Sequence, residues 1–483
     1  MDARDSSDGM EPLSTGRLPI ELLYFIFPYL DKPALSACSL VARGWINAAR
    51  LYLFEVIVYY ARAQHVSDTS NTPTPLEDFL VFLESTPSIR RYIRSLVLGM
   101  QEPSTGVLHL PIMNPEFTSD GVRGARLDSL YSILRHTQNL QTLTITDFSF
   151  EPPESPPGPN SLPGPPALQH LVGLNIQRYA YFGSLCTIEY ILSLLGLVGT
   201  VDRLVLNTTW SPGDHHSNVP TSPLPADKQL RELHVSGPAP SFGLLKVLDL
   251  SSLQVLDIPE FLDQDVEWLC GFLATAGRNL LHLNINLHHS MSVHLSPMSG
   301  IPPTHLAPIP FLSSLPLWKL AKLESLSFTF PTWSDYEKPF DESTTICIYE
   351  PAHAFIKQTL RTLPPSVRSI GFQVEHCHML YFADIVEGAP LGDSLLPFSD
   401  FDTILESRIA EQGLQTVEVM MNNWSYPQRH LVQQCIAKAL PKVCAKGAMF
   451  TKNYTLTFES WRKSVSSINS GCACHHRLTI CPV

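Results

Sequence analysis

Cysteine and histidine side chains, the residue types that bind zinc, gather at two places in the 483-residue sequence. One set is His376, Cys377 and His378, and the other is Cys472, Cys474, His475, His476 and Cys481. Along a strand Cys377 would point away from its two histidine neighbours. In the second set, the two cysteines of the Cys-x-Cys pair are closer in sequence than zinc ligands usually are. Only two residues follow Cys481, too few to form a structured site around these ligands. We therefore expect no metal site, and a flexible tail over residues 461–483.

Motifs for catalysis are absent from the sequence. It has no phosphate loop of the G-x-x-x-x-G-K type, no G-x-G-x-x-G, no G-x-S-x-G and no H-E-x-x-H. The histidine pairs at residues 215–216 and 288–289 fall in polar, loop-like segments and are expected on the surface. We expect a protein that is not an enzyme and has no cofactor. An enzyme without a recognisable motif remains an alternative, which a clustered pocket of His, Asp, Glu and Cys would favour.

Composition limits the partners of the chain. Its 33 basic and 45 acidic residues give a net charge of −12, and no basic run is present. This balance argues against nucleic acid and anionic membranes as partners. Residues 1–16 are polar and acidic, unlike a signal peptide, and the longest apolar runs reach only about a dozen residues, where a bilayer span needs about 20. The sequence predicts a soluble protein of the cytoplasm, the nucleus or both.

Most of the chain repeats a short phrase, apolar-x-x-apolar-x-apolar. Its central residue recurs ten times, at spacings between 23 and 47 residues, as Leu96, Leu143, Leu174, Leu204, Leu233, Leu256, Leu283, Leu326, Ile370 and Val417. The last three positions alternate as in a strand with one buried face, and the first apolar residue fits the turn that leads in. Helix-like stretches lie between phrases, for example at residues 127–136, 188–197, 266–274 and 352–360. An eleventh, terminal strand is expected at residues 454–458.

The repeated phrase resembles that of leucine-rich repeats, although the Asn or Cys that usually closes the phrase is mostly absent. The resemblance implies an irregular α/β solenoid, with a parallel sheet on the concave side and helices on the convex side. The residue between the two apolar strand positions then faces outward, and together these residues form what we call the outward row. From it we take as candidate target contacts Thr144, Asn175, Val205, His234, Asp257, Asn284, Ser327 and Glu418; Val97 and Gly371 complete the row.

Residues 18–54 differ from the repeats and predict three short helices. Pro19 suits a first helical turn, and Pro28 should end or kink that helix near Phe27. Asp31 is placed to cap a second helix, and after Gly44 a third helix begins near Trp45. So small a module cannot bury its apolar residues alone. Either the following domain or a partner must cover them. The spacing of the apolar residues does not decide between these two possibilities.

The residues of this module closely resemble an F-box in register. The matching strings are LPIELLYFIFPYL at residues 18–30 and LSACSLVARGW at residues 35–45, followed by Leu53 and Phe54; Pro28 is a departure from the pattern. F-box proteins bind the Skp adaptor of cullin ubiquitin ligases. The resemblance implies adaptor contacts among Leu18, Pro19, Leu22, Ile26, Phe27, Leu30, Leu35, Cys38, Leu40, Val41 and Trp45. Some of these must form the module's own core, and the sequence does not say which.

The sequence thus divides into four parts: residues 1–16, disordered; 17–58, the F-box-like module; 59–460, the repeat domain, with a proline-rich insertion near 151–166; and 461–483, the flexible tail. The resemblance implies a substrate-recognition adaptor of an SCF-type cullin ubiquitin ligase, whose repeats bind an unidentified target protein. An interaction scaffold that binds the Skp adaptor and acts outside ubiquitination is the alternative. The sequence does not separate the two.

Overall fold

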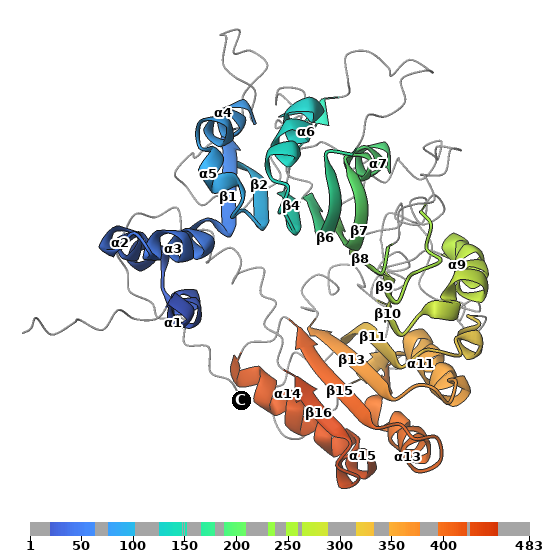
Figure 1. The fold of residues 1–483 in the computed structure, drawn as a ribbon. Coiled ribbons are helices and arrows are strands. Elements are labelled where there is room, and N and C mark those ends of the chain that lie inside the picture. The colour runs from blue at the N-terminus through green and yellow to red at the C-terminus, as the bar shows by residue number, and fades with distance from the viewer. Residues whose placement is uncertain are drawn as a thin grey trace, which may run out of the picture. The chain divides into compact units, whose positions relative to one another are not determined.

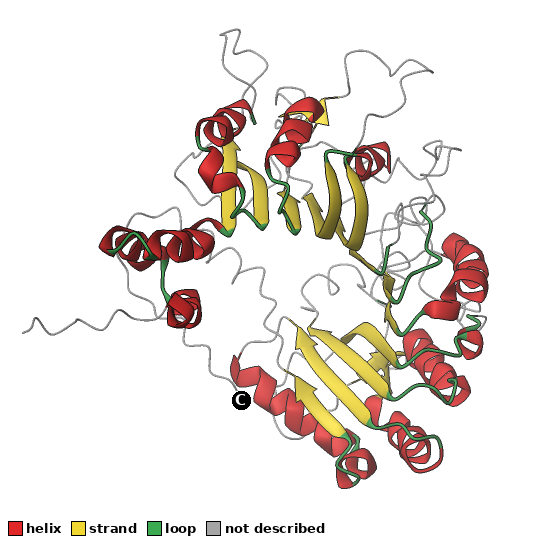
Figure 2. Ribbon diagram, viewed as in Figure 1, coloured by secondary structure: helices red, strands yellow, loops and turns green. Residues whose placement is uncertain are grey.

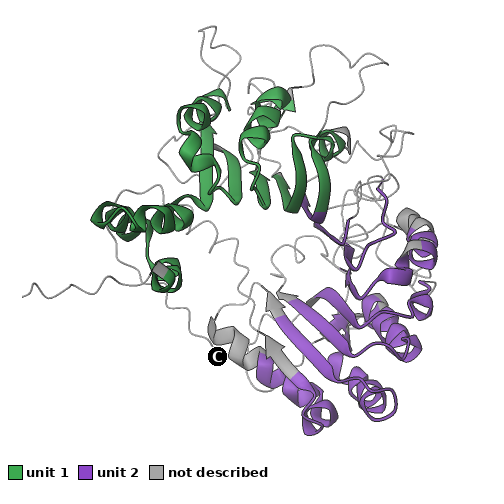
Figure 3. Cartoon of the chain, in the orientation of Figure 1, with its two compact units in different colours: residues 1–201 green, residues 202–483 purple. Residues whose placement is uncertain are grey.

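The structure, a computed structural model, describes residues 20–62, 76–101, 125–146, 148, 150–151, 166–178, 188–208, 230–236, 248–258, 263–287, 315–332, 347–376, 395–422 and 426–452. They form an α/β protein with a large parallel sheet, as predicted (Figures 1 and 2). The chain divides into two compact units, residues 1–201 and 202–483 (Figure 3). The predicted N-terminal disorder at residues 1–16, most of the proline-rich insertion, the strand at 454–458 and the tail lie outside the described residues.

Unit 1 begins with three helices and continues with alternating strands and helices. Its elements are α1 (Ile20–Ile26), η1 (Phe27–Tyr29), α2 (Lys32–Val41), α3 (Trp45–Phe54), β1 (Val56–Arg62), α4 (Glu77–Ser85), α5 (Pro87–Arg90), β2 (Ser95–Gln101), β3 (Ala125–Arg126), α6 (Leu127–His136), β4 (Thr142–Thr146), β5 (Phe150–Glu151), β6 (Leu168–Arg178) and α7 (Ile188–Gly196). The division between the units falls within β7 (Val198–Thr208).

Unit 2 continues the alternation to the last described residue. Its elements are β8 (Glu232–Ser236), β9 (Val255–Ile258), α9 (Asp263–Thr275), η5 (Ala276–Asn279), β10 (His282–Asn286), η9 (Leu317–Lys319), β11 (Ser325–Thr332), β12 (Cys347–Tyr349), α11 (Glu350–Thr362), β13 (Ser369–His376), β14 (Leu395–Pro397), η11 (Phe398–Phe401), α13 (Asp402–Glu411), β15 (Thr416–Asn422), α14 (Tyr426–Ala439), α15 (Pro441–Ala445) and β16 (Met449–Lys452).

The strands of the main sheet follow one another in chain order and pair in parallel. In unit 1 the order is β1-β2-β4-β6, and in unit 2 β8-β9-β10-β11-β13-β15-β16. Each predicted strand phrase ends within a strand of this sheet, which also includes β7, and its two strand positions are buried. The first apolar residue of each phrase is also buried, but Leu171 and Val201 lie inside the longer strands β6 and β7 rather than in turns.

The turns that lead into the strands are tied to the neighbouring repeat by shared carbonyl groups. The carbonyl oxygen of Arg94 accepts hydrogen bonds from the backbone N–H groups of Gln141 and Thr142, at 2.7 and 2.9 Å. The carbonyl of Leu281 likewise accepts from Glu324 and Ser325, at 2.8 and 2.9 Å. The same arrangement recurs at the carbonyls of Glu55, Arg231, Gln254, Glu324 and Arg368. These hydrogen bonds fix where a strand begins relative to its neighbour and so help to set the register of the sheet.

Helices cover one face of the sheet within each unit (Figure 2), and the apolar strand positions are buried. In unit 2 this face holds a cluster of phenylalanines. The ring of Phe372 on β13 lies 5.1 Å from that of Phe398 and 6.2 Å from those of Phe328 and Phe330, between ring centroids. Phe401 stacks on Phe372 at 6.0 Å. These five rings are fully buried and join β11 and β13 to η11.

Three structural features were not predicted from the sequence. Strand β1 precedes the first recognised phrase, although its sequence VIVYYAR is rich in the β-branched and aromatic residues that favour strands. Two small sheets, β3 with β5 and β12 with β14, lie outside the repeated phrase. The last described strand is β16, which precedes the expected strand at residues 454–458.

The buried carboxylate of Asp402, at the start of α13, holds α15 in place. It accepts hydrogen bonds from the backbone N–H groups of Lys442 and Val443, each at 3.1 Å. We expect Asp402→Ala to lower the free energy of unfolding by about 1–3 kcal/mol, because these buried donors lose their acceptor. Urea denaturation checks this, with Glu411→Ala, an exposed acidic position on the same helix, as the control. Equal effects of the two substitutions would contradict the assignment.

Candidate functional site

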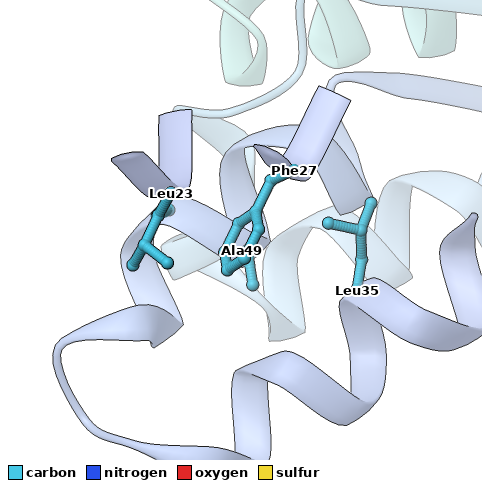
Figure 4. Close-up of a cluster of buried hydrophobic side chains, with 5 residues drawn as sticks. Leu23, Phe27, Leu35 and Ala49 are labelled. Atoms are coloured by element: carbon cyan, nitrogen blue, oxygen red, sulfur yellow. The ribbon is translucent and has the colours of Figure 1, made fainter. Parts of the chain in front are cut away.

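The first three helices enclose a small core of their own. Leu23 and Phe27 face Leu35 from α2 and Ala49 from α3 (Figure 4), and Ala48 completes the buried set. As predicted, α1 ends before Pro28, and α3 begins at Trp45. The predicted cap is also confirmed, since the backbone N–H of Ala34 donates to Asp31 Oδ1 at 2.9 Å.

The structure divides the eleven candidate adaptor contacts into core and surface. Two are buried in the core and three pack against it half-buried; these are Phe27 and Leu35, and then Leu30, Cys38 and Trp45. Four are exposed: Leu22 at 44%, Ile26 at 43%, Leu40 at 85% and Val41 at 67%. Leu18 and Pro19 lie outside the described residues. Among the nine described candidates, these four are therefore the most accessible to a partner.

Three further exposed residues of these helices are aromatic, and sequence reasoning missed them as candidate contacts. Phe25 is 72% exposed and Tyr29 88%, and Tyr24 is exposed to a lesser degree. Exposed large apolar side chains are candidates for contact with a partner. We call Leu22, Tyr24, Phe25, Ile26, Tyr29, Leu40 and Val41 the apolar surface of the helices. The sequence did contain a signal for the aromatic residues. A short helix exposed to water usually carries polar residues on the side away from its core, whereas α1 has the almost wholly apolar sequence IELLYFI.

Polar contacts join the helices to the first repeats of unit 1. The hydroxyl of Tyr92 donates to Asn47 Oδ1 on α3 at 2.9 Å, and Arg91 donates to that hydroxyl at 2.6 Å. The amide of Asn139, in the turn before β4, donates to the Arg91 carbonyl at 2.8 Å. Lys32 Nζ donates to the carbonyl of Val56 on β1. Two of these contacts thus connect the helices to the repeats: Lys32 of α2 to β1, and Asn47 of α3 to the residues before β2.

The outward row lies in line across each unit, because its residues pair directly between neighbouring strands. In unit 1 the register joins Val97 to Thr144 and Thr144 to Asn175. In unit 2 the paired positions run in order through Val205, His234, Asp257, Asn284, Ser327, Gly371 and Glu418. The expected periodicity of the strands is thus correct, and these positions share one face.

Members of the outward row differ in how much surface they offer. Thr144 is only 9% exposed, and its hydroxyl accepts from the Asn175 amide at 3.1 Å, so it contributes little contact area. Gly371 is covered because Ser327 stands over it; a Cβ built there would lie 2.3 Å from Ser327 Oγ. Val205, His234, Asp257, Asn284, Ser327 and Glu418 are half-exposed, as is Asn175.

His234 lies between two carboxylates on this face. Its Nδ1 lies 2.5 Å from Asp257 Oδ2 on the next strand, and its Nε2 lies 3.6 Å from Glu232 Oε2. Arg203 on β7 pairs with the same Glu232 oxygen at 3.5 Å. The hydrogen bond that His234 donates to the Asp257 carboxylate raises the pKa of His234, with burial and Arg203 acting against it and Glu232 adding least. The contact between His234 and Asp257 therefore links β8 to β9.

The pH dependence of this link has a defined sign. A histidine whose pKa is raised by folding stabilises the protein fully below about pH 6.5, and that stabilisation is lost as the pH rises through the folded pKa. We expect wild type to exceed His234→Gln in free energy of unfolding at pH 6, and the difference to shrink by pH 8. Urea denaturation of both proteins at the two pH values measures this. A difference that does not change with pH would contradict it.

Among the residues that the structure describes, no three His, Cys, Asp or Glu side chains are placed to hold a metal ion. Cys377 and His378 lie outside that part, as does the cysteine–histidine set at 472–481, and only the backbone of His376 is described. Within the described ranges no helix is both long and apolar enough to cross a bilayer.

Comparison with known proteins gives no relative: no family model matches the chain, and no curated protein does.

Proposed function

We propose that this protein is a substrate-recognition subunit of an SCF-type cullin ubiquitin ligase. The three N-terminal helices dock to the Skp adaptor as an F-box, and the repeats, forming an irregular solenoid, hold a target protein. The chain performs no chemistry; it acts by raising the effective concentration of the target near the ligase.

The observation that carries this proposal is the apolar surface of the helices. Leu22, Ile26, Leu40 and Val41 occupy positions of the F-box-like strings and stay exposed, whereas Phe27 and Leu35 fill the core. Exposed leucine and isoleucine side chains on a helix gain about 1.5–3 kcal/mol each when a partner buries them fully. Aromatic anchors such as Phe25 and Tyr29 would add to the central part of such an interface. A standard interface buries roughly 1,600 Å² in total.

The outward row is the proposed target face. Its residues line up across parallel strands, on the face opposite the one that the helices cover (Figure 2). Repeat arrays bind protein ligands along such a face when it is concave. The half-exposed polar residues, Asn175, His234, Asp257, Asn284, Ser327 and Glu418, offer hydrogen-bond donors and acceptors with which the face selects a target.

Two experiments test the proposal. Affinity capture of the full chain from cells should recover a Skp adaptor and a cullin, together with candidate targets identified by mass spectrometry. The half-life of each captured target should lengthen when the protein is depleted. Capture without adaptor would overturn the proposal. Capture with adaptor but unchanged target half-lives would support a scaffold that acts outside ubiquitination.

A further inference from the structure

His353 on α11 is a buried titratable residue that the proposed function does not use. Its side chain is 2% exposed, and the ring stacks on Phe401 of η11, with centroids 4.8 Å apart. Its Nε2 has no hydrogen-bond partner. A buried polar atom without a partner is rare in folded proteins and calls for a physical explanation.

The unpaired nitrogen faces a carboxylate. Nε2 of His353 lies 3.6 Å from Asp400 Oδ2, and that same oxygen accepts a hydrogen bond from Lys357 Nζ at 2.8 Å. Asp400 is thus already paired, and Lys357 holds its pKa below the usual range. A second positive charge on His353 would compete with Lys357 for one oxygen while remaining buried beneath Phe401.

The groups around the ring do not outweigh the cost of burying a charge there. Burial lowers the pKa of His353; Asp400, the Pro397 backbone and Glu350 act against this, and Lys357 adds to it. Strand β14 has no titratable side chain, and β12 carries Cys347 and Tyr349. The charged groups of α13 are Asp402, bound to the α15 backbone, Glu406, paired with Lys442, Arg408, bound to the Leu363 carbonyl, and the exposed Glu411. On η9, Lys319 lies over the exposed ring of Trp318.

We propose that His353 is an acid-sensitive latch that holds the segment Leu395–Phe401 on α11. The segment comprises β14, which pairs with β12, and η11, whose Phe398 and Phe401 belong to the phenylalanine cluster. With a neutral His353 the ring stays stacked and the segment stays docked. Protonation places a buried positive charge beneath Phe401, next to a carboxylate oxygen that Lys357 already binds, and the segment opens to hydrate this charge. Opening would expose the rings of Phe398 and Phe401, which do not belong to the outward row.

Amide hydrogen exchange of the full chain tests the latch. Peptides that cover residues 395–401 are compared at pH 7.5 and 5.5, after correction for the intrinsic effect of pH on exchange. One pH unit below the ordinary histidine pKa of about 6.5, protonation of the open state favours opening by up to about tenfold. We expect wild type to show this acid-induced gain in exchange and His353→Phe, which keeps an aromatic ring, to lose it. His282→Gln, at an exposed histidine on β10, is the control and should behave as wild type.

Two further variants predict opposite changes and do not depend on whether His353→Phe folds. Asp400→Asn removes the charge that favours protonated His353, so the acid-induced gain should grow. Lys357→Gln removes a charge that disfavours it, so the gain should fall. The latch is overturned if residues 395–401 exchange no faster at pH 5.5 in wild type, if His353→Phe keeps the gain, or if the two variants shift it in the same direction.

Discussion

Replacing Leu22 and Ile26 by aspartate together is expected to weaken binding of a Skp adaptor by about 100-fold or more. Both side chains are exposed, on α1, outside the core of Leu23 and Phe27. A charge at each position must be desolvated when the adaptor covers it, and two apolar contacts are lost. Titration calorimetry with purified adaptor and the full chain measures the change. Because the sites are exposed, the midpoint of thermal unfolding should change little.

Matched variants separate docking from general damage. Leu40→Asp with Val41→Asp, at the end of α2, should also weaken adaptor binding, since both side chains are exposed and occupy positions of the F-box-like string. Val81→Asp places a charge at an exposed apolar residue of α4 and should leave binding unchanged. Equal binding by wild type and both double variants would rule out the apolar surface of the helices as the docking site.

Truncating Phe372 to alanine is expected to cost about 3–5 kcal/mol of the free energy of unfolding. Its ring is fully buried and contacts four others, Phe328, Phe330, Phe398 and Phe401. Removing it leaves a cavity that rigid neighbouring rings fill poorly, and strands β11 and β13 lose their shared contact with η11. Denaturant unfolding followed by circular dichroism measures this loss.

Phe25→Ala is the control for this substitution. Phe25 is 72% exposed, so the same truncation should change the free energy of unfolding by only about 0.5 kcal/mol. If Phe372→Ala cost less than Phe25→Ala, the phenylalanine cluster would not be the centre of the unit 2 core.

The repeated phrase was predictable because its physics is local. A strand that buries one face needs apolar residues at every second position, and the positions Leu326 and Phe328 or Ile370 and Phe372 follow that rule. The helix at residues 127–136 was predicted with the bounds observed for α6, because its apolar residues recur at spacings of three and four residues. Asp31 marked the start of α2 because its side chain can cap a helix. Pro28 marked the end of α1 because proline lacks the backbone N–H that a helix needs.

What was not predictable depends on contacts between distant residues. Periodicity places Phe27 and Ile26 on neighbouring positions of one helix, and only the packing of α1 against α2 and α3 decides that Phe27 is buried and Ile26 exposed. The pairing of His234 with Asp257 needs the register of β8 on β9, across 23 residues of chain. The burial of His353 needs η11, which follows β14 and precedes α13.

Direct binding of a purified Skp adaptor to the purified full chain tests the central claim most directly. We predict a one-to-one complex that survives size-exclusion chromatography, and a loss of that complex when Leu22 and Ile26 are both aspartate. A full chain that is folded by circular dichroism and yet elutes separately from the adaptor at micromolar concentrations would contradict the account.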